Sequence, residues 1–382
     1  MNRFKVAILT TDKRESDRDY ANPVPCFGTA PEALLQGFAQ WPDAEIHVVS
    51  CAQQPLAAPE KIAPNIFFHS LLVPKLGWLR TGYQGCVRAA RRKLREIQPD
   101  IVHGQGTERD CALSAVLSGF QNVLTVHGNM RLIARVNRAR PFSFNWLAAR
   151  LESFTLPRAD GIVCITRYTE AAVRHEARRT WVVPNAVDPS FFEVASQPDE
   201  VPVILCVGYI SPRKNQNDFI RALDGAAGGR RFRIVFLGHV PDDLYGSEFR
   251  ALLATRPWCE AAGFADRGAL KTWLARATAL ALPSLEDNCP MAVLEAMAAN
   301  VPVMAANVGG VPDLVADGVT GVLCDPLNGG SMVRAFTALL DSSALRDTVA
   351  RNARQQAEVR FQPKAVAGRH LEIYREVLSK RA

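Results

Sequence analysis

Short apolar runs alternate with longer amphipathic segments along most of the 382-residue chain. The strand-like runs of the first half are 5–11, 45–51, 100–104, 122–128, 161–166 and 181–185. Helix-like segments separate some of them, at 30–41, 87–97 and 144–156. Continuous runs of Val, Ile and Leu between amphipathic helices predict a parallel sheet that is covered on both faces.

The alternation stops after Asp188, where "PSFFEVASQPDEVP" gathers Pro, Ser and acidic residues as in a linker. It then restarts with strand-like runs at 203–208, 232–238, 279–284, 301–306 and 321–326. We therefore predict two doubly wound α/β domains, residues 1–190 and 196–363, facing each other across a cleft. One long helix is expected over 332–359, and a last helix, 364–382, is expected to pack back onto the first domain.

The composition is that of an ordinary soluble protein, 48% hydrophobic and 22% charged. No apolar stretch of about 18 residues or more is present, and the first residues lack the pattern of a signal peptide. The nine cysteines are scattered without a C-x-x-C pair. These features predict a cytoplasmic protein with buried free thiols rather than a metal or redox motif.

The positive charge is concentrated in residues 1–190, which hold 24 basic and 17 acidic residues. Residues 75–95 contain seven basic residues and no acid, and residues 131–158 interleave six arginines with aromatic side chains. Both segments could lie on an anionic membrane surface. The alternative is a set of solvated faces beside a pocket for an anionic acceptor. No nucleic-acid-binding module is recognisable.

Residues 284–298, "SLEDNCPMAVLEAMA", place Glu295 in an apolar run. A buried carboxylate needs a polar partner, and the small neighbours Ala292 and Ala299 leave room for a ligand. The preceding turn predicts a helix that starts near Pro290 and is capped by Asn288 or Cys289, with amides suited to phosphate. The alternative is a surface glutamate on an amphipathic helix.

Two further loops follow predicted strands. "VILCVGYISPRKNQ" brings Arg213 and Lys214 to the end of a strand, where they could hold a diphosphate or could simply be solvated. Gly309 and Gly310 follow the strand-like run 301–306. They permit a close backbone approach, but a turn that needs glycine explains them equally well.

The block 282–326 resembles the donor-binding signature of family 4 retaining glycosyltransferases, in which a glutamate, seven residues, a second glutamate and Ala-Met-Ala follow one another. Here the two acidic positions are Asp287 and Glu295. The run 203–216 is similar to that family's diphosphate loop through Gly208 and Lys214. Weaker matches in the first half are "DIVHGQG", "NVLTVHGN", "GIVCIT" and "VVPNAVD".

The resemblance implies the GT-B fold of two Rossmann-like domains, with a nucleotide sugar in the cleft between them. It implies that Glu295 binds the ribose and Lys214 the diphosphate, and that these two residues line one pocket. The implied donor-binding residues are Gly28, Arg213, Lys214, Glu286, Asn288, Met291, Ala292 and Glu295. The implied catalytic residues are His127, Asp287 and Lys214, with His127 facing the donor sugar.

The chain departs from the family pattern at four positions. Asp287 is one methylene shorter than the usual glutamate, and Glu286 could take its role. Tyr209 stands where the resemblance implies an arginine, so that Arg213 would have to supply the second cation. Ala186 and Asn300 replace glycines.

The resemblance further implies transfer of a hexose from a UDP sugar, or less commonly a GDP sugar, to a hydroxyl acceptor with retention. The acceptor would attack from the leaving-group side without a covalent intermediate, a metal ion or a cofactor. Such activity would serve glycan, glycolipid or cell-surface polysaccharide synthesis, with a lipid-linked acceptor at the inner face of the cytoplasmic membrane. The string "DRD" at 17–19 is read as solvated loop charge, and the loop 12–27 is expected to shape acceptor choice.

Two alternatives remain open at this point. "GQGTER" at 104–109 begins like a dinucleotide-binding motif of an NAD-dependent dehydrogenase, but Arg109 stands where glycine or alanine is needed. A glycosyltransferase-like scaffold that has lost catalysis would explain Tyr209 and Asp287.

Overall fold

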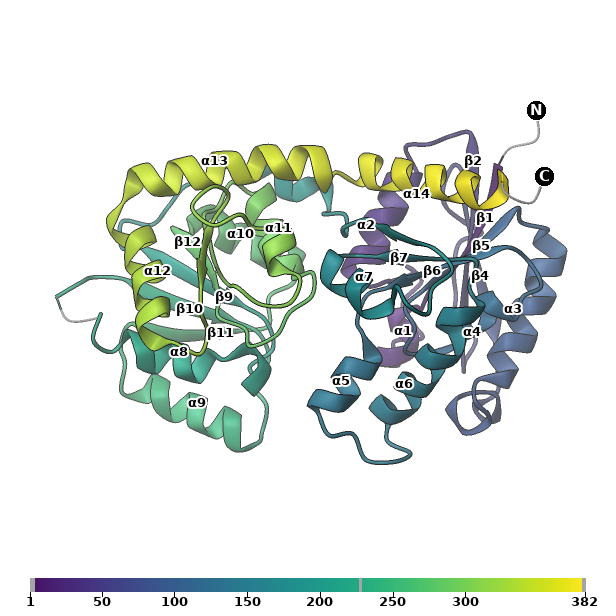
Figure 1. Cartoon of the computed structure of the whole chain (residues 1–382), viewed down its shortest axis with the longest axis horizontal. Coiled ribbons are helices and arrows are strands. Elements are labelled where there is room, and N and C mark those ends of the chain that lie inside the picture. The colour runs from purple at the N-terminus through teal and green to yellow at the C-terminus, as the bar shows by residue number, and fades with distance from the viewer. Residues whose placement is uncertain (1–3, 227–228, 380–382) are drawn as a thin grey trace. The chain divides into compact units, whose positions relative to one another are not determined.

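The computed structural model describes residues 4–226 and 229–379. The chain forms two compact units. The first contains the described residues up to Ala186 together with those from Pro363 onward, and the second spans Val187–Gln362. Each unit is built on one sheet that carries helices (Figure 1).

The sheet of the first unit has the strand order β3-β4-β2-β1-β5-β6-β7-β8. The pairing is parallel except at the edge, where β3 runs antiparallel to β4. The strands are β1 Phe4–Leu9, β2 Ala44–Ala52, β3 Lys61–Ala63, β4 Ile66–Leu72, β5 Ile101–Gln105, β6 Asn122–Val126, β7 Gly161–Cys164 and β8 Thr180–Val182. Strands β3 and β4 were not among the predicted ones.

Alternate residues of β1 enter two different hydrophobic cores, because successive side chains of a strand point to opposite faces. Ala7 and Leu9 belong to one core, and Val6 and Ile8 belong to the other. The helices of this unit are α1 Lys13–Asp17, α2 Thr29–Phe38, α3 Gln84–Ile97, α4 Asp110–Val116, α5 Met130–Val136, α6 Phe144–Thr155, α7 Arg167–Val173 and α14 Pro363–Leu378. Helix α14, at the yellow end of the chain, packs with the purple helix α2 (Figure 1).

The sheet of the second unit is entirely parallel, with the order β11-β10-β9-β12-β13-β14. Its strands are β9 Val203–Val207, β10 Arg233–Leu237, β11 Cys259–Gly263, β12 Ala279–Leu282, β13 Val303–Ala306 and β14 Val322–Cys324. This is the strand order of a doubly wound Rossmann sheet, 3-2-1-4-5-6. Strand β11, whose sequence is CEAAG, was not predicted because it lacks an apolar run.

The helices of the second unit are α8 Gln216–Leu223, α9 Leu244–Ala254, α10 Arg267–Arg276, α11 Met291–Ala298, α12 Gly329–Asp341 and α13 Ser343–Arg360. The prediction of one helix over 332–359 is wrong. Ser342 is extended, ends α12 and accepts a hydrogen bond from the backbone of Leu345 as the cap of α13. Among the described residues, no helix is long and apolar enough to cross a bilayer.

The strand order reverses between β1 and β5 in the first sheet and between β9 and β12 in the second. Open α/β sheets bind ligands at the carboxyl ends of the strands at such a switch point. The loops that follow these four strands are therefore the places where a site is expected.

Candidate active site

The loops that follow β9 and β12 meet at the switch point of the second sheet. The first loop leads from Gly208 into a short 3₁₀ helix, η5 Pro212–Lys214, and the second connects Leu282 with α11. The backbone N–H of Leu285 donates to the carbonyl oxygen of Arg213 at 2.8 Å. Because β9 and β12 are paired in parallel, both loops leave the sheet at the same edge.

An ion pair joins these two loops. The Nζ atom of Lys214 donates to Oδ2 of Asp287 at 2.5 Å, and the Ser284 hydroxyl donates to the same oxygen at 3.1 Å. The Lys214 and Asp287 side chains are only 14% and 11% exposed. An ammonium group has three donors, and among the described residues this is the one hydrogen bond that it makes. Lys214 therefore keeps donors for a ligand.

Arg213 adds a second cation to the cluster. Its Nη1 atom donates to the backbone carbonyl of Glu286 at 2.8 Å and lies 3.7 Å from Oδ1 of Asp287. Burial raises the pKa of the Glu286 carboxyl, and the nearby guanidinium opposes that shift. The structure thus brings together four predicted site residues from segments 73 positions apart.

Helix α11 begins directly after this cluster. Its N-cap is Pro290, which offers no side-chain hydrogen bond, so the predicted capping by Asn288 or Cys289 is wrong. Met291 and Ala292 are the first two helical residues and are half-buried. The first amides of a helix have no partner within the helix, and they carry partial positive charge that favours an anion.

Glu295 lies one turn further along α11 and is only 7% exposed, so the alternative of a surface glutamate is wrong. Burial raises the pKa of its carboxyl to about 7, and Arg267 opposes this shift. The Arg267 guanidinium itself pairs with Asp188 at 2.8 Å. Among the described residues, Glu295 accepts no hydrogen bond. A buried polar group in this state is costly, and a ligand hydroxyl would satisfy it.

The glycine pair after β13 supports the Asp287 backbone. Gly309 has a φ of +55°, and a Cβ atom there would lie 2.0 Å from the carbonyl oxygen of Asp287. The N–H of Gly310 donates to that same oxygen at 3.0 Å. The predicted close backbone approach therefore occurs at position 309, and the positive φ found there is a second reason for glycine.

Tyr209 occupies the position at which the resemblance implies an arginine. Its side chain is exposed, and its ring lies tilted against His239 with the centroids 5.4 Å apart. The positive charge of this loop therefore comes from Arg213 and Lys214.

His127 belongs to the first unit, directly after β6. Its Nε2 atom lies 2.8 Å from Oε1 of Gln105. Burial lowers the pKa of His127 to about 4, so that the ring is neutral at pH 7. His103, in β5, is fully buried between the Tyr374 hydroxyl and Thr125, at 2.6 and 2.7 Å, and thus has a structural role.

Gly28 is the N-cap of α2, with a φ of −65° that any residue can adopt. A Cβ atom there would meet only the Pro31 side chain, at the ordinary distance of 3.5 Å. The local structure therefore does not require glycine at position 28. The absence of a side chain there leaves space beside the N-terminus of α2.

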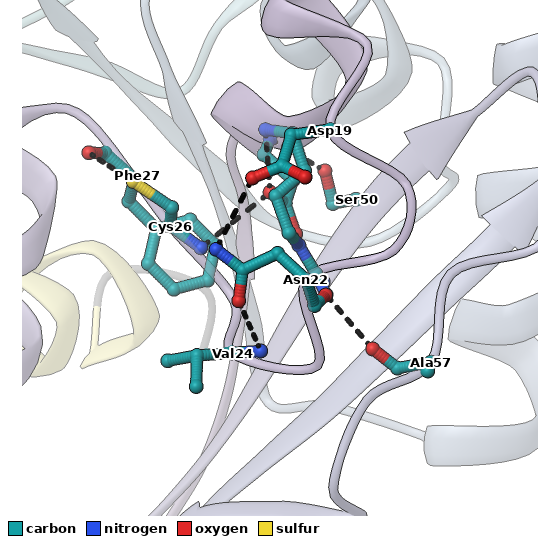
Figure 2. A network of polar contacts seen from close by, with 9 residues as sticks. Asp19, Asn22, Val24, Cys26, Phe27, Ser50 and Ala57 are labelled. Carbon is teal, nitrogen blue, oxygen red and sulfur yellow. Dashed lines mark hydrogen bonds and ion pairs between the residues drawn. The ribbon is translucent and has the colours of Figure 1, made fainter.

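The loop after β1 is held by a buried ion pair. Both Arg14 and Asp12 are almost completely buried, with 2.7 Å between Nη2 and Oδ2. Arg14 also donates to the carbonyl oxygens of Asn22 and Ala57, and the Asp12 N–H donates to Ser50. Figure 2 shows the labelled partners of this network. The string at 17–19 is exposed, as expected for solvated loop charge.

The sequence did not single out three residues that contribute to the cluster around α11. Ser284 follows β12 by two positions, and its place just before the acidic pair was the available signal. Asp188 and Arg267 are 79 positions apart, and nothing in the sequence links them to each other or to Glu295.

Two family models match this chain. The model described as "Glycosyl transferases group 1" matches residues 188–356, and "Glycosyltransferase Family 4" matches residues 32–191. The chain is a glycosyltransferase of the group 1 type. The prediction of a glycosyltransferase is thereby confirmed, and the dehydrogenase alternative is wrong.

Relatives of this glycosyltransferase match over most of its length. The 2-deoxystreptamine glucosyltransferase of Streptomyces kanamyceticus is 27% identical over 379 residues, covering 92% of this chain and 96% of the relative. Sucrose-phosphate synthase from Thermosynechococcus elongatus has a TM-score of 0.78 at 20% identity and covers 99% of this chain and 100% of its own. Anabaena HepE, solved in complex with UDP and glucose, has a TM-score of 0.71 at 17% identity, covering 98% and 100%. The predicted GT-B fold of two Rossmann-like domains is confirmed.

Proposed function

We propose that this glycosyltransferase moves a sugar from a nucleoside-diphosphate sugar to an acceptor hydroxyl with retention of anomeric configuration. The observation that carries the proposal is the Lys214–Asp287 pair at the switch point of the second sheet. A mostly buried ammonium with donors to spare suits a diphosphate, and a neighbouring carboxylate suits the hydroxyls of a sugar.

In the proposed reaction, the bond between the anomeric carbon and the diphosphate oxygen breaks. The acceptor oxygen bonds to that carbon from the same face, and its proton passes to a diphosphate oxygen. Lys214, Arg213 and the first amides of α11 stabilise the negative charge that develops on the leaving diphosphate. The protein supplies no covalent nucleophile, so trapping of a glycosyl adduct on a side chain would contradict this mechanism.

The carboxyl of Glu295 is proposed to accept hydrogen bonds from the ribose hydroxyls. Its burial and its lack of a hydrogen bond within the described residues support this assignment. Asn288, Met291 and Ala292 are proposed to face the diphosphate. The assignments of Gly28 to a phosphate and of His127 to the sugar stay predictions.

UDP is proposed as the nucleotide in preference to GDP, and glucose as the first sugar to test. The support is that HepE was solved in complex with UDP and glucose and that a full-length relative is a glucosyltransferase. No metal ion or organic cofactor is proposed at the donor site, since two side-chain cations already lie there. Turnover is expected to continue through a short exposure to chelator and not to need added Mg²⁺ or Mn²⁺.

The acceptor is proposed to be lipid-linked or anionic, with the enzyme resting on the inner face of an anionic membrane. The first basic segment, 75–95, contributes Arg88 and Arg92 to a surface cavity of about 440 Å³ beside Leu76, which is 72% exposed. The second, 131–158, exposes Phe142 by 81%. Exposed apolar side chains among arginines fit an anionic bilayer surface. Co-sedimentation with anionic but not with neutral vesicles is expected, and its absence with both would contradict the membrane contact.

The decisive experiment incubates the purified enzyme with a panel of UDP, GDP and ADP sugars. Thermal shift measures binding, because a ligand that binds the folded state raises its stability. Release of the nucleoside diphosphate measures turnover, and NMR of the product gives the anomeric configuration. Donor binding without hydrolysis or transfer across the panel would favour the scaffold alternative, and an inverted product would overturn retention.

A further inference from the structure

Three buried side chains converge at the carboxyl edge of the first sheet. Cys51 is the second-last residue of β2, Cys86 lies in the first turn of α3, and Asp110 is the first residue of α4. Their two Sγ atoms and a carboxylate oxygen all lie within 4.8 Å of one another. The donor site described above belongs to the other unit.

The three side chains are neighbours in the folded protein. The Cys51 thiol lies beside both the Cys86 thiol and the Asp110 carboxyl. A tetrahedral zinc ion with Zn–S bonds of about 2.3 Å separates two sulfur ligands by about 3.8 Å. A contraction of roughly 1 Å or less would thus turn this cluster into a coordination sphere.

The charges around the cluster also suit a divalent cation. Two thiolates and one carboxylate carry three negative charges, which a divalent ion reduces to one. The positive charge of the Arg109 guanidinium favours the ionised form of the Asp110 carboxyl. It can also balance the one negative charge that remains when the divalent ion is bound. Tyr83, which is 3% exposed, and Cys111 belong to the core that is packed around Cys51 and Cys86.

We propose that Cys51, Cys86 and Asp110 form a structural site for a thiophilic divalent cation, with Zn²⁺ as its ion and a water molecule as the fourth ligand. Binding converts the two thiols to thiolates and releases their two protons. The ion links β2, α3 and α4 and stabilises the first unit. It takes no part in glycosyl transfer, so the site goes beyond the proposed function.

The test uses the full chain, purified without chelators from cells grown with zinc. The metal content is measured by plasma mass spectrometry, and the ion is then exchanged for Co²⁺ under anaerobic conditions. The variants are Cys51→Ser, Cys86→Ser and Asp110→Asn. The matched control is Cys164→Ser, because Cys164 is a buried thiol of the same unit that lies outside the cluster.

The wild type and the control are expected to hold one zinc per chain and to show a thiolate-to-cobalt charge-transfer band with Co²⁺. Each of the three ligand variants is expected to lose more than about 100-fold in metal affinity. Zinc should raise the melting temperature of the apo wild type but not that of Asp110→Asn. If a serine variant fails to fold, the melting temperatures of the wild type and of Asp110→Asn with and without zinc still test the proposal.

Three results would overturn the site. They are a wild type without zinc after anaerobic reconstitution, equal zinc in the ligand variants and the control, or a Cys51–Cys86 disulfide in the fresh protein. The metal measurements involve no nucleotide sugar. Failure of this site and failure of the proposed function can therefore be told apart.

Discussion

The two switch points of the molecule each carry a buried ion pair, and the two pairs are built differently. At the first sheet, the Arg14 guanidinium donates to both oxygens of Asp12 and to the backbone carbonyls of Asn22 and Ala57. Its side chain is 1% exposed. At the second sheet, Lys214 makes one hydrogen bond within the described residues and is 14% exposed.

This difference separates a structural ion pair from one that is suited to a ligand. The donors of Arg14 are used within the protein, so the pair fixes the loop after β1. Lys214 keeps donors and partial access to solvent, and its partner Asp287 is held by Ser284 and by the backbone around Gly309. We therefore expect damage to the first pair to lower stability and damage to the second to lower turnover.

Arg14→Met should have the largest effect, because it leaves the Asp12 carboxylate buried without its cation. Breaking a buried pair in this way costs about 3–5 kcal/mol of unfolding free energy. Denaturant unfolding of the wild type and the variant measures it. The control is Lys13→Ala, at the exposed neighbouring position, which should change stability by less than about 0.5 kcal/mol. A loss equal to that of the control would mean that the first pair is not structural.

Lys214→Ala should lower kcat by about 10²–10³, because it removes a cation from the leaving diphosphate. Its unfolding free energy should fall by less than that of Arg14→Met, because Lys214 gives up one hydrogen bond within the described residues and Arg14 gives up several. Lys271→Ala, in α10 of the same unit, is the matched control and should retain the wild-type rate. Steady-state kinetics with the best donor of the panel measures the change in kcat. Denaturant unfolding measures the change in stability. A stability loss as large as that of Arg14→Met would remove the contrast between the two pairs.

Gly309→Ala should disturb the support of Asp287. The Cβ atom would overlap the Asp287 carbonyl oxygen, which must move, and this costs about 1–3 kcal/mol beyond the strain of the positive φ. Gly318→Ala isolates that strain, because Gly318 has a φ of +68° with nothing within 4 Å of its added Cβ. Unfolding free energies and kcat of the two variants are compared. If the two variants lose equal stability and equal activity, the close approach of residue 309 to the Asp287 carbonyl contributes to neither.

The features that the sequence predicted well are those within one strand–turn–helix segment. Asp287 and Glu295 lie eight positions apart on such a segment, so their relation to β12 and α11 follows from local spacing. The second-sheet cluster required Lys214 to meet Asp287 across 73 positions, and the resemblance to a family supplied that link. The doubly wound fold followed from the alternation of apolar and amphipathic segments.

The features that the sequence did not predict depend on contacts without a local period. Arg14 finds its partners in Asn22 and Ala57, which are loop carbonyls that any residue type could supply. Cys51 and Cys86 are 35 positions apart and meet only because β2 and α3 are neighbours. A search for closely spaced cysteines could not find them.

Glu295→Gln tests whether the buried carboxyl of the second unit is a further ligand-binding group. The pKa of Glu295 is raised to about 7 from 4.5. The unfolded chain therefore loses this proton at lower pH than the folded one, so this residue's contribution to stability falls as the pH rises from about 4.5 to 7. The variant should remove that fall, which is on the order of 1–3 kcal/mol. Unfolding free energies at pH 5, 6, 7 and 8 measure it, with Glu200→Gln at an exposed position as control.

The same substitution should weaken nucleotide binding. Ribose hydroxyls donate more strongly to an ionised carboxylate than to an amide, and the loss of one charged hydrogen bond costs about 1.5–3 kcal/mol. The affinity of the wild type for UDP should therefore rise as the pH passes through about 7, whereas that of Glu295→Gln should stay flat. If the affinity for UDP depends on pH in the same way in the wild type and the variant, Glu295 has a structural role, like the Arg14–Asp12 ion pair. The ribose would then be bound elsewhere.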